Sequence, residues 1–146
     1  MELRKMKIED YDQVFDLWVR TPGMGLNTTD DSFEGIEKYL KRNPNTCYVA
    51  VEGQQIVGAI LSGNDGRRGY ISHTAVEVEM QRQGIGTRLV AQALEALHRE
   101  GITKVALVVF QRNLNGNTFW EKLGFSKRED LVYRNKELIQ LDRVDT

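Results

Sequence analysis

Residues 76–89 read Val76-Glu77-Val78-Glu79-Met80-Gln81-Arg82-Gln83-Gly84-Ile85-Gly86-Thr87-Arg88-Leu89, and this stretch decides the fold class of the chain. A β-branched apolar run ends in a polar turn, and two glycines one residue apart open an amphipathic helix. The first amides of a helix lack partners inside the helix and carry roughly half a positive charge. Because glycine leaves the backbone bare, a phosphate or pyrophosphate can approach those amides. The stretch therefore predicts a strand, an anion-binding turn and a helix.

Two common phosphate motifs do not fit this turn. A P-loop requires a lysine after its last glycine, and none follows Gly86; a dinucleotide fingerprint requires a third glycine where this chain has Leu89. The pattern that does fit is Gln/Arg-x-x-Gly-x-Gly/Ala, present as Gln81-Arg82-Gln83-Gly84-Ile85-Gly86. It resembles the pyrophosphate loop of the GNAT superfamily of N-acetyltransferases, which bind acetyl-coenzyme A.

A second motif strengthens this resemblance. Residues 113–125 read Asn113-Leu114-Asn115-Gly116-Asn117-Thr118-Phe119-Trp120-Glu121-Lys122-Leu123-Gly124-Phe125. They are similar to the superfamily pattern Asn-x-x-Ala-x-x-Phe-Tyr-x-x-x-Gly-Phe, in which a helix follows the fifth strand. The resemblance extends in layout from Leu3 to about Leu141. It implies an α/β fold with a mixed sheet, in the order β-α-α-β-β-β-α-β-α-β(-β), with helices on both faces and one N-acetyltransferase domain over residues 1–146.

Hydrophobic patterning predicts the individual elements, with proline and glycine marking their ends. The stripe Tyr11, Val14, Phe15, Trp18 indicates a helix that ends before Pro22. We expect strands over 3–6, 46–52, 55–64, 69–78 and 104–110, further helices over 32–42, 85–100 and 116–123, and one or two closing strands. Asp31 is expected to cap the second helix.

Bulk composition narrows the class of protein. Twenty basic and twenty-one acidic residues in 146 argue against a nucleic-acid surface. Cys47 is the only cysteine, so no intrachain disulfide can form, and we expect a reducing, cytoplasmic compartment. Its apolar neighbours predict a buried thiol rather than a nucleophile. No apolar run approaches the roughly 20 residues that span a membrane, so no membrane partner is expected.

The resemblance also implies a site for acetyl-coenzyme A. In this superfamily the fourth and fifth strands splay apart beside a bulge, and the pantetheine arm enters the gap. The implied residues along the arm are Ala75, Val76 and Val78, contacting it through main-chain groups. The pyrophosphate would lie on the amides of Arg82, Gln83, Gly84, Ile85, Gly86 and Thr87, with Gln81 at the entrance. Asn113 would contact the cofactor, Phe119 would pack near the arm, and Lys122 would approach the nucleotide end; no metal is expected.

The implied reaction is direct attack of a neutral amine on the thioester. A lysine-like amine has a pKa of about 10.4, so a base or a water relay must first remove a proton. His73 is the best candidate by chemistry, because imidazole titrates near neutrality, but a strand side chain facing away from the gap would be only structural. Glu77 and Glu79 are alternatives. A backbone N–H of the fourth strand is expected to stabilise the oxyanion.

Trp120 departs from the family pattern. Many relatives place there a tyrosine that protonates the leaving thiolate, and indole cannot replace it because it only donates a hydrogen bond. Either the thiolate needs no acid, or Ser72, Thr118 or Tyr133 serves, or the protein binds acyl-coenzyme A without turnover. We expect Trp120 itself to lie in the core.

The acceptor is left open by the sequence. The resemblance implies that the loop Thr21–Asp31 and the chain near the last strands shape its pocket. A small amine, a peptide N-terminus and a protein lysine all remain, as does a homodimer. Three functional classes stand: an N-acetyltransferase, a non-catalytic acyl-coenzyme A-binding module, and an unrelated nucleotide-binding protein.

Overall fold

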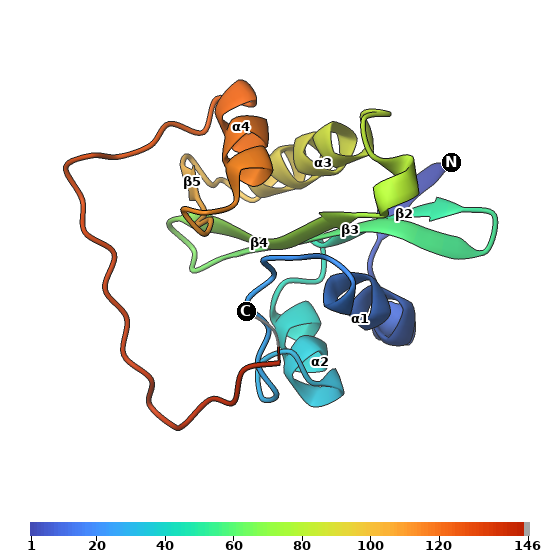
Figure 1. Cartoon of the computed structure of the whole chain (residues 1–146), viewed down its shortest axis with the longest axis horizontal. Helices are drawn as coiled ribbons and strands as arrows, with labels where there is room; N and C mark the ends of the chain where they lie inside the picture. Colours follow the sequence, from blue (N-terminus) through green and yellow to red (C-terminus); the bar gives the residue numbers. More distant parts are fainter. Residues whose placement is uncertain (145–146) are drawn as a thin grey trace.

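The computed structural model describes residues 1–144 and contains a five-stranded sheet in the order β1-β2-β3-β4-β5. Helices α1 and α2 cover one face, and α3 and α4 cover the other (Figure 1). The elements are β1 (Glu2–Lys5), the 3-10 turn η1 (Ile8–Asp10), α1 (Tyr11–Val19), α2 (Phe33–Arg42), β2 (Tyr48–Glu52), β3 (Gln55–Asn64), β4 (Gly69–Val76), the 3-10 turn η2 (Val78–Met80), α3 (Ile85–Arg99), β5 (Val105–Ala106) and α4 (Leu114–Lys122).

The sheet is mixed, as expected. Strands β1 to β4 pair antiparallel, and β5 pairs parallel to β4 through only two residue pairs, Gly69–Val105 and Tyr70–Ala106. The mixed α/β class with helices on both faces is confirmed.

Each face of the sheet has its own apolar core. On the α1 and α2 side, Val14, Leu17 and Trp18 are fully buried with Leu40 close by. On the α3 side, Leu89 is fully buried at the centre of a second cluster. Burying a large apolar side chain contributes about 1.5–3 kcal/mol, so the stripes read from the sequence are also what hold the helices to the sheet.

The predicted strand over 104–110 is mostly wrong. Only Val105–Ala106 pairs, because β4 separates from the chain beyond Tyr70 and residues 107–110 have no strand beside them. An apolar run predicts burial, but a strand also needs a neighbour at hydrogen-bonding distance.

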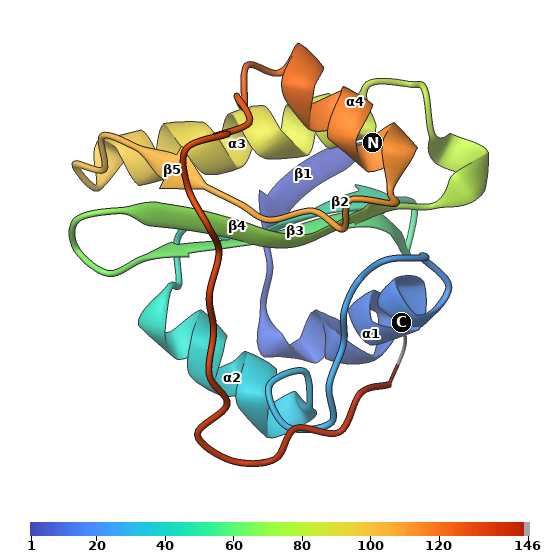
Figure 2. The ribbon, with the colours of Figure 1, turned by 60° about the vertical axis from the view of Figure 1, so that its left-hand side comes forward.

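The predicted closing strands are absent from residues 1–144. After Phe125 the chain makes an exposed arch, and its end returns to form one bridge, Asn27 with Arg143 (Figure 1). The arch crosses from the α4 side of the sheet to the α2 side (Figure 2). Its larger apolar side chains are exposed: Leu131, Val132, Tyr133, Leu138 and Ile139. The segment has strand-like residues, but up to residue 144 it pairs with no strand of the sheet.

No helix among residues 1–144 is both long and apolar enough to cross a membrane.

Candidate active site

The turn between β4 and α3 is built around a left-handed glycine. Gly84 has φ +82°, and no atom lies within 4 Å of the position that a Cβ would take. The helical ladder begins where the Arg88 amide donates to the Gly84 carbonyl at 3.0 Å. The amides of Ile85, Gly86 and Thr87 therefore precede the ladder, and no acidic side chain stands in this first turn. This geometry suits an anion.

Gly86, the second glycine of the motif, lacks a side chain for a different structural reason. A Cβ on Gly86 would lie 3.2 Å from Phe119 Cζ and 3.7 Å from Val76 Cγ2. Gly86 therefore allows α4 to pack closely on the start of α3. Sequence reasoning assigned both glycines to the anion, whereas the structure gives Gly86 a packing role as well.

Beyond Tyr70, β4 presents an open edge. The Glu77 amide donates to the Val57 carbonyl of β3 at 2.8 Å. Because hydrogen-bonding direction alternates along a strand, the main-chain groups of Val76 face the opposite side, toward the open edge. Gln81 closes this end, since its Nε2 donates to the Val76 carbonyl at 3.0 Å.

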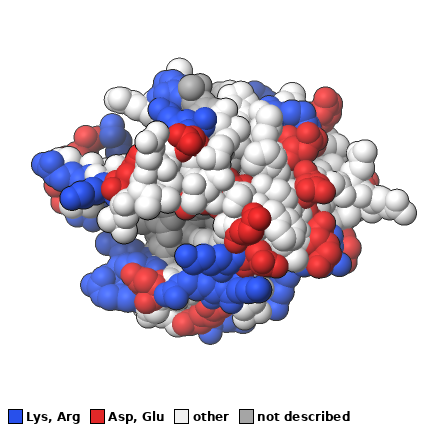
Figure 3. All heavy atoms as spheres, turned by 90° about the horizontal axis from the view of Figure 1, so that it is seen from below, with Lys and Arg blue, Asp and Glu red and all other residues white. Residues whose placement is uncertain are grey.

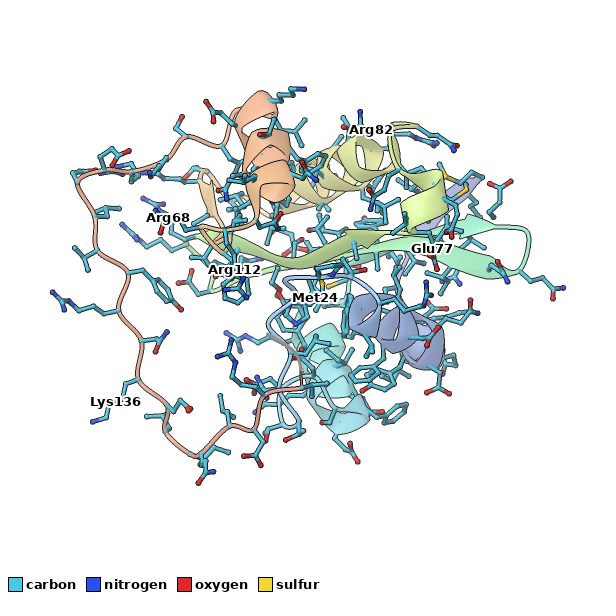
Figure 4. The ribbon with its side chains drawn as sticks, viewed as in Figure 1. Met24, Arg68, Glu77, Arg82, Arg112 and Lys136 are labelled. Carbon is cyan, nitrogen blue, oxygen red and sulfur yellow. The ribbon has the colours of Figure 1, made fainter. Side chains whose placement is uncertain are left out.

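The remaining residues expected along the arm have different environments. The Ala75 side chain is buried in the core on the α1 side, so only the main-chain groups of Ala75, which belong to β4, could contact the arm. Val78 lies beyond the strand, in η2, with its side chain 68% exposed. Arg82 has φ +66° and projects from the turn above η2 (Figure 4). Gln83 lies in the same turn.

A bulge in β4 reorients the middle of the strand. Ala59 pairs with Ala75 and Leu61 pairs with Ser72, so His73 and Thr74 together oppose one residue of β3. The φ of His73 is +47°, in the left-handed region that few non-glycine residues adopt. As a result the strand changes face: Ile71 packs in the core on the α3 side and Ala75 in the core on the α1 side.

The bulge places His73 against two partners on the α1 side. Its Nε2 lies 2.7 Å from Asp31 Oδ1, and its ring meets the Trp18 ring edge-on at 4.9 Å between centroids. The expectation that Asp31 caps α2 is wrong. Ser32 is the cap, because its Oγ accepts the Gly35 amide at 3.0 Å. The Asp31 side chain instead faces the sheet.

The other two base candidates differ from His73. Glu77 forms a paired contact with Arg20, at 2.6 Å and 2.7 Å, at the end of β4 (Figure 4). The hydrogen bond from Arg20 lowers the pKa of Glu77, which makes this carboxylate a weaker base. Glu79 is exposed in η2. Neither side chain contacts the bulge.

The second motif is built into α4. Asn113 caps this helix, accepting the Gly116 amide at 2.9 Å, and its Nδ2 lies beside Gly23 of the loop after α1. Trp120 is partly buried against the α3-side core, edge-on to Phe119 and Phe125 with ring centroids 5.0 Å and 5.2 Å away. Lys122 is exposed in the last turn.

Cys47 is excluded as a nucleophile. It is 1% exposed, and burial raises the pKa of its thiol to about 12.

A hollow of about 620 Å³ lies on the α2 side of the molecule. Its walls are the loop from Gly25 to Asp30 and the C-terminal arch from Tyr133 to Arg143. These are the two regions that the resemblance implied for the acceptor. Figure 3, viewed from below, shows acidic and basic side chains interspersed on this side of the molecule.

Comparison with known proteins identifies the family. The model of the acetyltransferase (GNAT) family matches residues 11–125, most of the chain. This chain belongs to that family. An acetyltransferase of Photorhabdus laumondii is 32% identical over 140 residues, covering 95% of this chain and 96% of the relative. One from Sodalis glossinidius is 29% identical over 140 residues, covering 96% and 97%.

Solved structures of GNAT proteins share the fold. The PaiA N-acetyltransferase of Thermoplasma acidophilum, solved in complex with coenzyme A, superposes with a TM-score of 0.74 at 18% identity, covering 86% of this chain and 89% of that chain. Ard1 of Thermoplasma volcanium superposes with a TM-score of 0.72 at 20% identity, covering 86% and 82%. Membership in the family makes this chain an acyltransferase, with acetyl transfer as its general reaction.

Two residues of the candidate site were missed by sequence reasoning. Asp31 lies 42 positions from His73, and Arg20 lies 57 positions from Glu77. No motif spacing joins either pair, since α1, α2 and β4 meet only in the folded chain. The left-handed conformation at the bulge was also missed, because the residue there is His73 and not a glycine.

Proposed function

We propose that this protein is an acetyl-coenzyme A-dependent N-acetyltransferase, which moves the acetyl group to a primary amine by direct attack in a ternary complex. The observation that carries the proposal is the continuity of two features. The open edge of β4 leads through η2 into the anion-binding turn at Gly84. A ligand with an amide-rich arm and a pyrophosphate needs both, in that order along the chain.

Coenzyme A fits this arrangement by its chemistry. The amides of the first turn of α3 would hold its pyrophosphate, and the outward main-chain groups of Val76 would pair with its arm. The PaiA structure, which shares the fold, was solved with coenzyme A bound, and this supports the assignment.

The reaction requires a base on the acceptor side of the sheet. His73 is the residue we assign, because the bulge turns its side chain to the α1 face beside the open edge of β4. Glu77, neutralised by Arg20, and Glu79, outside the strand, are weaker candidates. The departing thiolate, with an acidity near that of cysteine at about 8.5, leaves without a dedicated acid.

The acceptor pocket that we propose is the hollow between the loop Gly25–Asp30 and the C-terminal arch. Met24, in the same loop, lies beneath β4, and Lys136 lies out on the arch (Figure 4). A small amine, a peptide N-terminus and a protein lysine are the acceptor classes to test.

The test is calorimetric titration with acetyl-coenzyme A, coenzyme A and ATP, followed by a thiol-release screen over these three classes of amine. We expect binding of both coenzyme species, weaker binding of ATP, and release that depends on the amine. Binding without release across the panel would contradict transfer and leave a binding module. Absence of coenzyme A binding would contradict the whole proposal.

A further inference from the structure

We propose that Asp31 is a positioning residue for His73: it holds the imidazole with its proton on Nε2, so that Nδ1 is the atom that accepts a proton from the acceptor. This inference rests on the proposed function and adds a residue that no motif of the chain contains.

The contact itself determines the tautomer. His73 Nε2 and Asp31 Oδ1 are 2.7 Å apart. An ionised carboxylate only accepts hydrogen bonds, so the hydrogen between these atoms belongs to Nε2. A neutral imidazole has one N–H, and Nδ1 is therefore left with its lone pair.

The carboxylate of Asp31 is itself held in place. Its Oδ2 accepts a hydrogen bond from the Asn27 amide at 2.9 Å. The backbone carbonyl of Asp31 accepts a hydrogen bond from the Tyr11 hydroxyl at 2.6 Å. Only 6% of the side chain is exposed. A buried carboxylate without partners would be costly, and here each oxygen has a partner, one of which is the histidine.

The imidazole is held from a second side. The Trp18 ring, which is fully buried, packs edge-on against it with an interplanar angle of 82°. Between Trp18 and Asp31 the ring has little freedom to rotate. Such an arrangement fixes which nitrogen meets the acceptor, which is the function of a positioning residue in acid–base catalysis.

Backbone geometry favours a functional role over a purely structural one. A φ of +47° is a strained conformation for a non-glycine residue, and such strain gathers at functional sites. The side chain of His73 is 16% exposed. Within residues 1–144, Nδ1 forms no hydrogen bond, and it is not one of the sealed polar atoms without a partner, which are Trp18 Nε1 and Thr74 Oγ1. Nδ1 therefore still reaches solvent.

Other charged or titratable groups lie near the pair, and in the described part of the chain none of them forms a hydrogen bond or an ion pair with the ring. Tyr11 and Asp30 lie on the Asp31 side, and Arg20 with Glu77 lies at the end of β4. The last two neutralise each other. Asp31 is the charged group that contacts the imidazole, and together with the Trp18 ring it sets the orientation of the imidazole.

The proposed step balances as follows. Nδ1 of His73 takes one proton from the acceptor ammonium, which gives a neutral amine and an imidazolium stabilised by Asp31. The amine nitrogen forms a bond to the acetyl carbon, and the carbon–sulfur bond breaks with its electron pair on sulfur. The second nitrogen proton goes to the thiolate through water, and the imidazolium returns its proton to solvent.

Nitrogen NMR tests the tautomer directly. The chain has two histidines, His73 and the exposed His98, so ring-¹⁵N spectra of the protein and of His98→Gln assign every signal. At a pH where the ring is neutral, we expect protonated Nε2 and bare Nδ1 at His73. In Asp31→Asn the replacing amide donates to Nε2, and the two signals should exchange. A wild-type ring with its proton on Nδ1 would overturn the inference, whatever the activity.

Kinetics give the second readout, using the amine found in the screen. If His73 is the base, as in the proposed function, the kcat of His73→Gln should fall by roughly 100-fold or more, and its rate should no longer rise with pH as the wild-type rate does. We expect Asp31→Asn to lose a similar factor because its tautomer is wrong, as in serine proteases, where the same change costs about 10⁴-fold. His98→Gln and the exposed Asp12→Asn are the matched controls and should keep wild-type rates.

Two outcomes separate this inference from the proposed function. If the wild type binds coenzyme A and turns over, but Asp31→Asn matches it in rate, the positioning role is wrong and the function stands. If the wild type neither binds coenzyme A nor releases thiol, the proposed function fails, while the NMR result still decides the tautomer. Coenzyme A affinity in Asp31→Asn should equal that of the wild type, which excludes general unfolding as the cause.

Discussion

The two ends of the open edge of β4 differ in the groups that form them: backbone amides at one end and side chains at the other. At the turn into α3, the candidate anion site consists of backbone amides exposed by Gly84. At the bulge, the candidate catalytic centre consists of side chains brought together from three elements: His73, Asp31 and Trp18. A backbone site depends on local conformation, whereas a side-chain site depends on tertiary packing. One end of β4 can therefore be predicted from sequence, whereas the other end cannot.

Deleting Thr74 should break the side-chain end and leave the turn intact. The deletion removes the extra residue of the bulge, so that His73 would oppose Ile60 and point to the α3 face with it. We expect a loss of roughly 100-fold or more in amine-dependent thiol release, comparable to loss of the base itself. Thiol release and far-ultraviolet circular dichroism check this. Full activity in a folded deletion variant would show that the bulge does not position the base.

Gly84→Val should break the backbone end. A β-branched residue is strained at φ +82° and covers the amides with its side chain. We expect coenzyme A affinity to fall by roughly 10- to 100-fold, which is about 1.4–2.7 kcal/mol. Calorimetry measures it. The matched control is Gly53→Val, which places the same residue at φ +63° in open space on the β2–β3 turn and should bind normally.

Gly86→Ala sharpens the comparison within one motif. The added methyl would lie 3.2 Å from the Phe119 ring, so this ring must move by a few tenths of an ångström. Overpacking of this kind typically costs about 1–3 kcal/mol of unfolding free energy. Urea unfolding measures the loss. If stability is unchanged and only coenzyme A affinity falls, the packing role of Gly86 is wrong.

Glu77→Gln should have the smallest effect. Arg20 lowers the pKa of Glu77, so the pair stabilises the fold fully above the unfolded value of 4.5. This contribution is lost as the pH falls from that value through the folded-state pKa. Because Arg20 is 48% exposed, we expect only about 0.5 kcal/mol. Thermal unfolding against pH should show the variant less stable at neutral pH, with the difference vanishing in acid. A large loss of kcat instead would return Glu77 to the list of bases.

The elements of the fold that could be predicted are likewise those that depend on local sequence and not on tertiary packing. Strand β3 matched its predicted bounds, 55–64, because both of its faces are apolar and a hairpin turn limits each end. Helices α2 and α3 began and ended within one residue of expectation, since their stripes and the glycine at 101 are local signals. The strand over 104–110 and the closing strands were wrong, because a ladder requires a neighbour that the segment itself does not encode.

Local sequence was sufficient to predict the glycine turn before α3, the order of helices and strands as far as α4, and membership in an acetyltransferase family. These depend on glycine conformation, apolar periodicity and motif spacing, all of which act over a few residues. Only the tertiary structure decided that Asp31 faces His73 instead of capping α2, that Arg20 neutralises Glu77, and that Gly86 admits Phe119. Those contacts join residues that the chain keeps far apart. They exist because α1 and α2 bury apolar residues against one face of the sheet and α4 packs its aromatic side chains on the core of the other face, which brings distant residues within reach.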